Sequence, residues 1–258
     1  MLEKPLILVT NDDGVHAKGI REIVDVLKPY GDIIVVAPDR GNSAKGHSVT
    51  LVDPIYVHKV SSDENVKIYA CSGTPADCVK LALHEIVPRK PDFLVSGINH
   101  GCNSSINIVY SGTMGAAIEG AINGIPSIGF SILSWNPDAD FTVAKKYSKI
   151  IFENMLRDGL PEGTTLNVNF PYCAPEDIKG IKMCRQTKGT WKEEFDKRLD
   201  PHKREYYWLC GNYHNLEPLA TDTDEWALKN NYVAVVPVTI DYTNYSALGH
   251  LQNWNLAH

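Results

Sequence analysis

The sequence predicts an α/β protein with a Rossmann-like three-layer α/β/α core, a mostly parallel sheet and an additional C-terminal arm. Short continuous apolar runs alternate with segments of helical periodicity up to about residue 170, and beyond Pro171 the chain turns to short charged segments and aromatic clusters. A continuous apolar run is typical of a strand that is buried on both faces. Strands that alternate with helices form parallel sheets through right-handed crossovers. We therefore expect a core over residues 1–170 and an arm over residues 171–258 that returns one strand to the core.

The N-terminal half has clear element boundaries. In chain order we expect a strand over 6–9, a helix over 20–27, strands over 33–37, 49–60 and 66–70, a helix from Thr74, and a strand over 93–95. The start at Thr74 has a specific signal, because a threonine N-cap followed by Pro75 at the first helical position commonly begins a helix. A long polar loop is expected to follow the strand at 93–95.

The second half continues the alternation. Ser111–Thr113 begin a helix of small residues that ends near Gly124. After it we expect a strand over 125–133, a helix over 141–156, a strand over 165–170 and a late strand over 232–240.

Composition excludes several functions. The 258 residues have a formal net charge of −6 at pH 7, and no apolar run is long enough to cross a membrane. Because phosphate polymers and anionic membranes require a basic surface, we expect neither a stable nucleic-acid partner nor a membrane. The six cysteines include no C-x-x-C pair and no leader precedes the first strand, so we expect reduced thiols and a cytoplasmic location.

One segment departs from the acidic average. Residues 179–204 contain nine Lys or Arg residues against four acidic residues. Two interpretations remain open: a solvated arm, or a basic lip over an anionic ligand.

Polar side chains follow three of the expected strands at their carboxyl ends. Asp12 and Asp13 follow the first strand, Ser43 lies in the loop after the second, and Asn99 follows the strand at 93–95. In open parallel sheets ligands bind beyond the carboxyl ends of the strands. We therefore expect these oxygen donors to meet at one edge of the sheet.

Two adjacent carboxylates suggest a cation. At about 4 Å they repel by roughly 4 kcal/mol at an effective dielectric constant near 20, so a divalent ion is needed to keep both ionised. Oxygen donors without a Cys or His cluster favour Mg²⁺ or Mn²⁺ over zinc. Gly14 allows the tight turn that presents both acids, although an interpretation in which they merely cap the next helix stays open.

The helix that begins at Ser111, Gly112 and Thr113 offers free backbone N–H groups, two hydroxyls and the positive end of a helix dipole, which together suit a phosphate. Neither a P-loop nor a dinucleotide-binding G-x-G-x-x-G motif is present. His16, His47 and His100 fall in the same loops and are either structural or available for proton transfer.

The chain resembles the SurE survival protein family. The resemblance rests on Thr10–Gly14 with His16, Ala37–Arg40 with Ser43, Gly73–Val79, Ser96–Asn99, Tyr110–Thr113 with Glu119, Asp200-Pro201, Tyr207-Trp208, and 232–241. It implies a phosphatase that acts on nucleoside 5′-monophosphates, and often 3′-monophosphates, with a C-terminal segment exchanged between subunits of a homodimer or homotetramer.

The resemblance also implies a site. One divalent metal ion per subunit, Mg²⁺ or Mn²⁺, would be held by Asp12, Asp13, Ser43 and Asn99, the residues that the strand ends also indicate. Asp12 and Asp13 would be catalytic. Substrate contacts are expected from Asn11, Gly14, Asn99, Ser111, Gly112 and Thr113.

The segment Asn103–Val109 departs from the family pattern, which commonly has a glycine and an acidic pair before Tyr-Ser-Gly-Thr. The departure at Ser105, Ile106 and Asn107 leaves the expected metal ligands unchanged and affects loop shape and nucleotide preference. Two rival hypotheses remain open: phosphoryl transfer through an aspartyl phosphate, and a metal-gated nucleotide sensor without turnover. His16 and His100 are candidates for the acid that protonates the leaving nucleoside.

Overall fold

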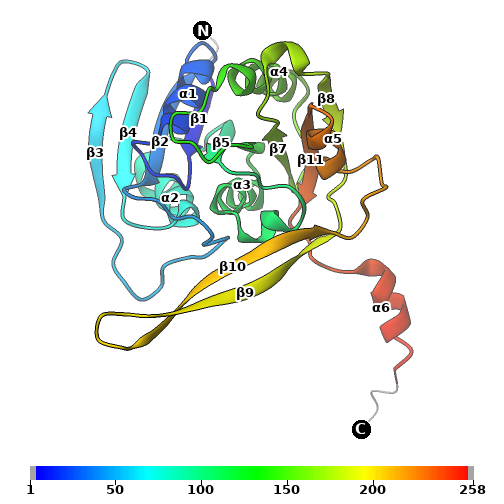
Figure 1. Ribbon diagram of the computed structural model, residues 1–258. Coiled ribbons are helices and arrows are strands. Elements are labelled where there is room, and N and C mark those ends of the chain that lie inside the picture. The colour runs from blue at the N-terminus through cyan, green and yellow to red at the C-terminus, as the bar shows by residue number, and fades with distance from the viewer. Residues whose placement is uncertain (1–3, 255–258) are drawn as a thin grey trace.

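The computed structural model describes residues 4–254; the parts of the expected core and arm at residues 1–3 and 255–258 lie outside the described residues. Within residues 4–254, nine strands form one sheet in the order β3-β4-β2-β1-β5-β6-β7-β11-β8, and β9 and β10 form a separate hairpin (Figure 1). The strands are β1 (Leu6–Thr10), β2 (Asp32–Pro38), β3 (Val57–Ser62), β4 (Val66–Cys71), β5 (Phe93–His100), β6 (Ser127–Ile132), β7 (Thr164–Phe170), β8 (Gly180–Met183), β9 (Gly189–Leu199), β10 (Glu205–Asn215) and β11 (Tyr232–Thr239).

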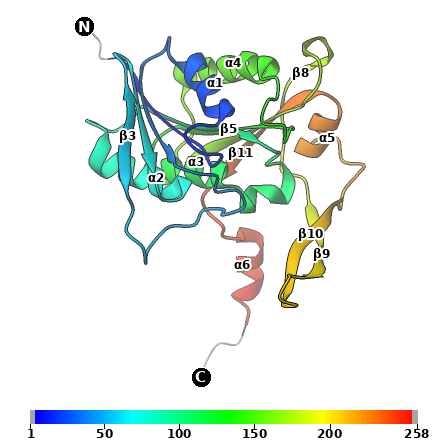
Figure 2. The same cartoon turned by 60° about the vertical axis from the view of Figure 1, so that its left-hand side comes forward.

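Helices cover both faces of this sheet. They are α1 (Lys18–Leu27), α2 (Pro75–Leu81), α3 (Gly112–Ile122), α4 (Thr142–Asp158), α5 (Asp224–Lys229) and α6 (Tyr245–Leu251), with a π-helical turn η1 (Ala82–Ile86) and 3₁₀ turns η2 (Ser105–Tyr110) and η3 (Pro175–Asp177). Helices α1 and α4 lie on one face, and α2 and α3 lie on the other (Figure 2). The neighbouring strands β4, β2, β1, β5, β6 and β7 are all parallel, which confirms the three-layer, mostly parallel fold class. None of the helices within residues 4–254 is long and apolar enough to span a membrane.

Most expected elements are present within a few residues of their predicted bounds. The start of α2 is confirmed in detail: the Thr74 hydroxyl accepts a hydrogen bond from the Asp77 backbone N–H, and the Asp77 carboxylate accepts one from the Thr74 N–H. This reciprocal capping satisfies two N–H groups that would otherwise be unpaired at a helix start.

The strand predicted over 49–60 is wrong in its first half, because β3 begins at Val57. Residues 49–56 are irregular, and the Thr50 N–H donates to the Asp77 carboxylate, 3.0 Å away, instead of to a neighbouring strand. Pro54 also lacks the N–H group that a strand ladder requires. The alternating apolar residues in this segment therefore resemble a strand, but the segment pairs with no neighbouring strand.

The C-terminal region adds both strands and a projecting hairpin. β11 pairs antiparallel with β7, and β8 pairs parallel with β11, so residues beyond 171 extend the main sheet. The hairpin of β9 and β10 crosses one side of the core and extends beyond it, while α6 projects away from the body (Figure 1). The sequence analysis expected the strand that became β11 but not the hairpin, whose strands have no single buried face to impose alternation.

Phe152 of α4 lies at the centre of one face of the core. Its ring is fully buried and makes edge contacts with the rings of Tyr30 and Phe93, each with a centroid distance of 5.4 Å. The contacts join α4 to β5 and to the turn that follows α1.

Phe152→Ala is expected to lower the free energy of unfolding by about 3–5 kcal/mol, because it removes a buried ring and leaves a cavity. Urea denaturation followed by circular dichroism measures this loss. Leu156→Ala, in the same helix but at a side chain that is 38% exposed, is the matched control and should cost much less. Equal losses for the two variants would contradict the packing described here.

Candidate active site

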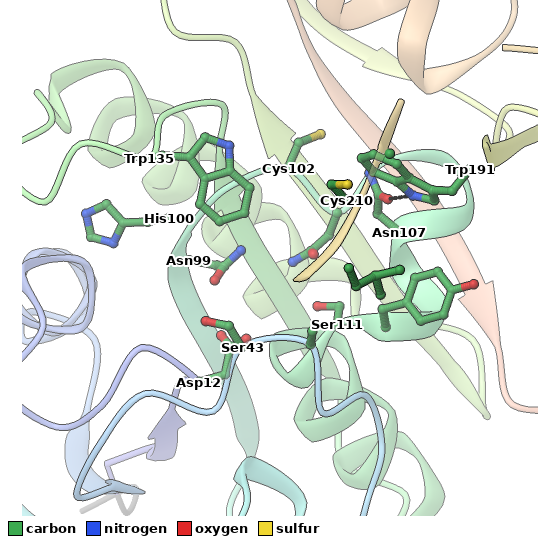
Figure 3. A pocket seen from close by; sticks show the side chains of 15 residues that line it. Asp12, Ser43, Asn99, His100, Cys102, Asn107, Ser111, Trp135, Trp191 and Cys210 are labelled. Carbon is green, nitrogen blue, oxygen red and sulfur yellow. Dashed lines mark hydrogen bonds between the residues drawn. The ribbon is translucent and has the colours of Figure 1, made fainter. Parts of the chain in front are cut away.

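A cavity of about 530 Å³ opens at the carboxyl ends of β1 and β5 (Figure 3). Asp12, Ser43, Asn99 and Ser111, which the sequence predicted to meet, all line it. The remaining lining residues are Ala44, His100, Cys102, Asn103, Asn107, Tyr110, Trp135, Trp191, Leu209, Cys210 and Gly211. Sheet topology therefore brings these four predicted side chains together, although Asp12 and Ser111 are 99 positions apart in the chain.

Asp12 is more deeply buried than Asp13. It follows the end of β1, is 4% exposed, and accepts a hydrogen bond from the Thr113 hydroxyl. Burial raises the pKa of Asp12 to about 6; the Thr113 hydroxyl opposes this rise and the nearby charge of Asp13 adds to it. No Lys, Arg or His within the described residues forms an ion pair with Asp12, so its charge lacks a protein cation.

Asp13 turns toward His100. Its Oδ2 atom accepts from the His100 backbone N–H at 3.0 Å and lies 3.0 Å from His100 Nδ1. The other ring nitrogen of His100, Nε2, is buried without a hydrogen-bond partner. Asp13 does not itself line the cavity, whereas His100 does.

Asn99 reaches the site through an irregular strand end. The sequence placed Asn99 in a loop after a strand that ends at 95, but β5 continues to His100, so that boundary is wrong. The pairing of β5 with β6 shifts register between Ser96 and Asn99, which redirects the side chain at the strand end. Asn99 Nδ2 donates to the Gly101 carbonyl at 2.8 Å, and this leaves its Oδ1 atom available to a ligand.

The predicted phosphate site at the start of α3 has the expected local structure. Ser111 is the N-cap, and its hydroxyl oxygen accepts from the Met114 N–H. A Cβ atom on Gly112 would lie 2.9 Å from Asp12 Cβ, so only glycine allows the helix start to approach the acid this closely. The Thr113 hydroxyl is used by Asp12, which makes Thr113 a support for the acid in this structure.

Asn11 and Gly14, predicted as substrate contacts, shape the loop after β1. Asn11 Nδ2 donates to the Gly14 carbonyl at 2.9 Å, and Asn11 Oδ1 accepts from the Gly14 N–H at 3.2 Å. Gly14 has φ +106°, a conformation that favours glycine. His16 is exposed and does not line the cavity, whereas His47 pairs with Glu119 on α3.

The donor set fits a hard divalent cation. Two carboxylates, a serine hydroxyl and an amide oxygen are all oxygen ligands, and the buried Asp12 charge has no protein counter-ion. Within the residues that the structure describes, no group of three or more His, Cys, Asp or Glu side chains could hold a metal ion.

The aromatic part of the cavity is not among the residues that the sequence predicts. Trp135 follows β6 and is 79% exposed, and a Cβ atom on Gly101 would lie 2.5 Å from its ring. Trp191 begins the hairpin on the other side, and Leu209–Gly211 of β10 complete the wall (Figure 3). An exposed tryptophan in a short loop carries no periodic signal, so only the folded arrangement could identify it. None of the nine basic residues of 179–204, all within the described part, lines the cavity.

The segment that departs from the family pattern holds the hairpin. Asn107 Oδ1 accepts from Trp191 Nε1 at 2.9 Å, and Ser105 Oγ accepts from the Tyr213 hydroxyl at 2.9 Å. The buried Asp224 carboxylate accepts from the backbone N–H groups of Ser105 and Thr187, 2.8 and 3.0 Å away. The departure therefore lies where the hairpin meets the cavity wall.

The buried carboxylate of Glu119 forms ion pairs with two partly exposed side chains. Its carboxylate is 2.9 Å from His47 Nε2 and 2.8 Å from Lys80 Nζ. Burial acts to raise the pKa of Glu119, but hydrogen bonds from His47 and Lys80 outweigh burial and hold the pKa at about 2. Glu119 is therefore ionised throughout the neutral range.

This fold and this cavity define a class of protein: α/β proteins with a Rossmann-like sheet and a strand-end cavity whose donors suit a cation and a phosphate. A family model described as "Survival protein SurE" matches residues 7–193. The chain belongs to the SurE family, which confirms the resemblance inferred from the sequence.

Individual relatives cover the whole chain. A protein of Flavobacterium psychrophilum named "5'-nucleotidase SurE" is 53% identical over 257 residues, which span 99% of each chain. A protein of the same name from Christiangramia forsetii is 54% identical over 256 residues, 98% of each. The crystal structure of the SurE protein from Aquifex aeolicus matches with a TM-score of 0.82 and 40% identity, over 96% of this chain and 98% of that one.

Glu119→Gln should lower stability in a pH-dependent way. Because the folded pKa lies below the usual value of 4.5, the charge stabilises the fold above about pH 4.5, and this contribution is lost as the pH falls through about 2. We expect a loss on the order of 2 kcal/mol at pH 7 that shrinks as the pH falls. Urea unfolding of parent and variant from pH 7 to pH 3 measures it, and a difference that does not change with pH would contradict the assignment.

Proposed function

We propose that this chain is a metal-dependent 5′-nucleotidase that hydrolyses nucleoside 5′-monophosphates, and also 3′-monophosphates, to nucleoside and phosphate. The observation that carries the proposal is one cavity with oxygen donors and a helix start at one end and tryptophans at the other. Relatives named "5'-nucleotidase SurE" at 53% and 54% identity support the same activity.

Asp12, Asp13, Ser43 and Asn99 would hold one divalent ion per subunit, Mg²⁺ or Mn²⁺. When bound, such an ion supplies polarisation of a phosphoryl oxygen and a lowered pKa for a coordinated water. Both acids are already oriented by hydrogen bonds: Thr113 orients Asp12, and His100 orients Asp13. These two hydrogen bonds fix the direction of both carboxylates.

The start of α3 would bind the phosphate. Ser111 can donate its hydroxyl hydrogen to a phosphate oxygen while its own oxygen caps the helix through Met114. The first backbone N–H groups of the helix lack intrahelical partners and carry the positive end of the dipole. These groups hold negative charge where it accumulates during phosphoryl transfer.

Proton transfer in the reaction would involve Asp12, Asp13 and His100. Asp12 or Asp13 would orient or deprotonate the attacking water. Of the two histidines considered for protonating the leaving nucleoside, His100 lines the cavity and His16 does not. This placement favours His100 as the acid that protonates the leaving nucleoside.

The aromatic end would hold the nucleobase. Indole rings provide flat apolar surfaces on which a base can stack, and Trp135 and Trp191 line the cavity together. Asn107 uses its carbonyl oxygen for Trp191, so its amide N–H₂ remains to donate to a base. The tryptophans distinguish a nucleotide site from a general phosphate site.

We also propose assembly through the C-terminal region, as a homodimer or homotetramer in the cytoplasm. A two-stranded hairpin is marginally stable alone, yet β9 and β10 pair only with each other within the described residues. Their apolar side chains Phe195, Leu199, Trp208 and Leu209 are exposed, as are Tyr245, Leu248 and Trp254 on and after α6. A second copy that exchanges these elements would cover them.

Phosphate release from AMP with Mn²⁺ tests the activity. We expect turnover that EDTA abolishes, and Asp12→Asn should lower kcat/KM by at least about a hundredfold because it removes a charged ligand without changing shape. Asp25→Asn, an exposed acid on α1, is the control. Absence of metal-dependent turnover in the unsubstituted chain would reject the nucleotidase and favour a sensor.

Trp135→Ala separates base recognition from phosphate recognition. We expect KM for AMP to rise about tenfold, because one stacking surface is lost, while KM for ribose 5-phosphate stays unchanged. Tyr56→Ala, which removes an exposed ring outside the cavity, is the control. Equal changes for the two substrates would contradict the base site.

A further inference from the structure

Helix α3 contacts two separate segments that carry expected metal ligands. At its first turn, Thr113 donates a hydrogen bond to Asp12. Further along the same helix, Glu119 lies 2.9 Å from His47, which is in the same loop as Ser43. One rigid element therefore holds both the Asp12 carboxylate and the Ser43 loop.

The loop that carries Ser43 is anchored by backbone hydrogen bonds on both sides, and between these anchors the Lys45 N–H also donates to the Asn42 carbonyl at 3.3 Å. On one side the Asn42 N–H donates to the Asp12 carbonyl at 2.7 Å, and on the other the Gly46 N–H donates to the Tyr110 carbonyl at 3.0 Å. The three residues between them, Ser43, Ala44 and Lys45, are exposed. Their conformation is therefore determined mainly by the two anchors.

The middle of this loop is held in an unfavourable conformation. Ala44 has φ +61°, and a left-handed backbone costs a residue with a Cβ atom about 1–2 kcal/mol. Such a conformation persists only where the surrounding structure imposes it. If an anchor were lost, the backbone at Ala44 would adopt a more favourable conformation, and this change would move Ser43.

The second anchor lies directly on α3. A Cβ atom on Gly115 would lie 2.8 Å from the Gly46 carbonyl oxygen and 2.9 Å from His47 Cα, so the loop backbone packs on the helix without a gap. The carboxylate that holds the His47 ring is only 3% exposed and is fixed from its other side by Lys80 at 2.8 Å and by Asn123 at 3.0 Å. The His47 ring therefore meets a carboxylate that two further hydrogen bonds hold in place.

We propose that Glu119, acting through His47, is a positioning residue for the metal site, because it sets the loop that presents Ser43 beside Asp12. The inference rests on the proposed function, in which Ser43 is a metal ligand. It assigns a role in metal affinity to two side chains that do not line the cavity.

Equilibrium binding of Mn²⁺ to the full chain, followed by the electron paramagnetic resonance signal of the free ion, tests this role without turnover. His47→Ala removes the link and is expected to weaken Mn²⁺ binding by about tenfold, a typical effect of losing an outer-shell partner. His47→Gln, whose amide can donate from a similar position, is expected to restore most of the affinity. A merely structural role would not produce this recovery in metal affinity.

The same substitution in a Ser43→Ala background identifies the route. If His47 acts through Ser43, His47→Ala should change Mn²⁺ affinity little once the hydroxyl is absent, because the two effects are coupled. Lys145→Ala breaks a comparable ion pair with Glu22 between α1 and α4, on the other face of the sheet, and is the matched control. Thermal unfolding of every variant confirms that it is folded.

Three results would overturn the inference. His47→Ala could bind Mn²⁺ as tightly as the parent, it could weaken binding equally with and without Ser43, or Lys145→Ala could weaken binding as much. In each of these the proposed metal site survives. If the unsubstituted chain bound no Mn²⁺, the metal site and the inference would both be rejected.

Discussion

The site depends on the close packing of the first turn of α3 against the acid at the end of β1. Gly112 allows this approach, since a Cβ atom there would collide with Asp12, and Thr113 donates a hydrogen bond to the carboxylate. The helix dipole and the hydroxyl stabilise the buried charge only in part, because burial still raises the pKa of Asp12 to about 6. Asp12 is thus a buried carboxylate with further oxygen donors around it. A divalent cation bound there would compensate its charge.

The two ends of the cavity come from different parts of the architecture. The polar end is built from the parallel core, where strand order brings the ends of β1 and β5 together. The aromatic end combines Trp135 with the hairpin, which meets the core through Asn107, Ser105 and Asp224. If the hairpin is also where subunits exchange, assembly and the shape of the base site would be physically linked.

Sequence reasoning succeeded where a signal was local. The capping box at Thr74 and the helix start at Ser111 depend on residues within one turn, and both are present. It failed where a long-range partner decided the outcome: residues 49–56 alternate like a strand but have no neighbouring strand. Asn99 lies near the end of β5, where the pairing with β6 shifts register, and no sequence pattern marks such a shift.

By itself, the sequence determined the fold class, the family and four of the polar residues that line the cavity, because apolar periodicity and strand-end motifs are encoded in neighbouring residues. Tertiary structure alone decided which tryptophans face the cavity, that Thr113 supports Asp12, and that Glu119 reaches the Ser43 loop through His47. These contacts join residues 72 or more positions apart, as in the pair of His47 and Glu119. Their geometry is set by how helices and loops pack on the sheet, which local sequence does not specify.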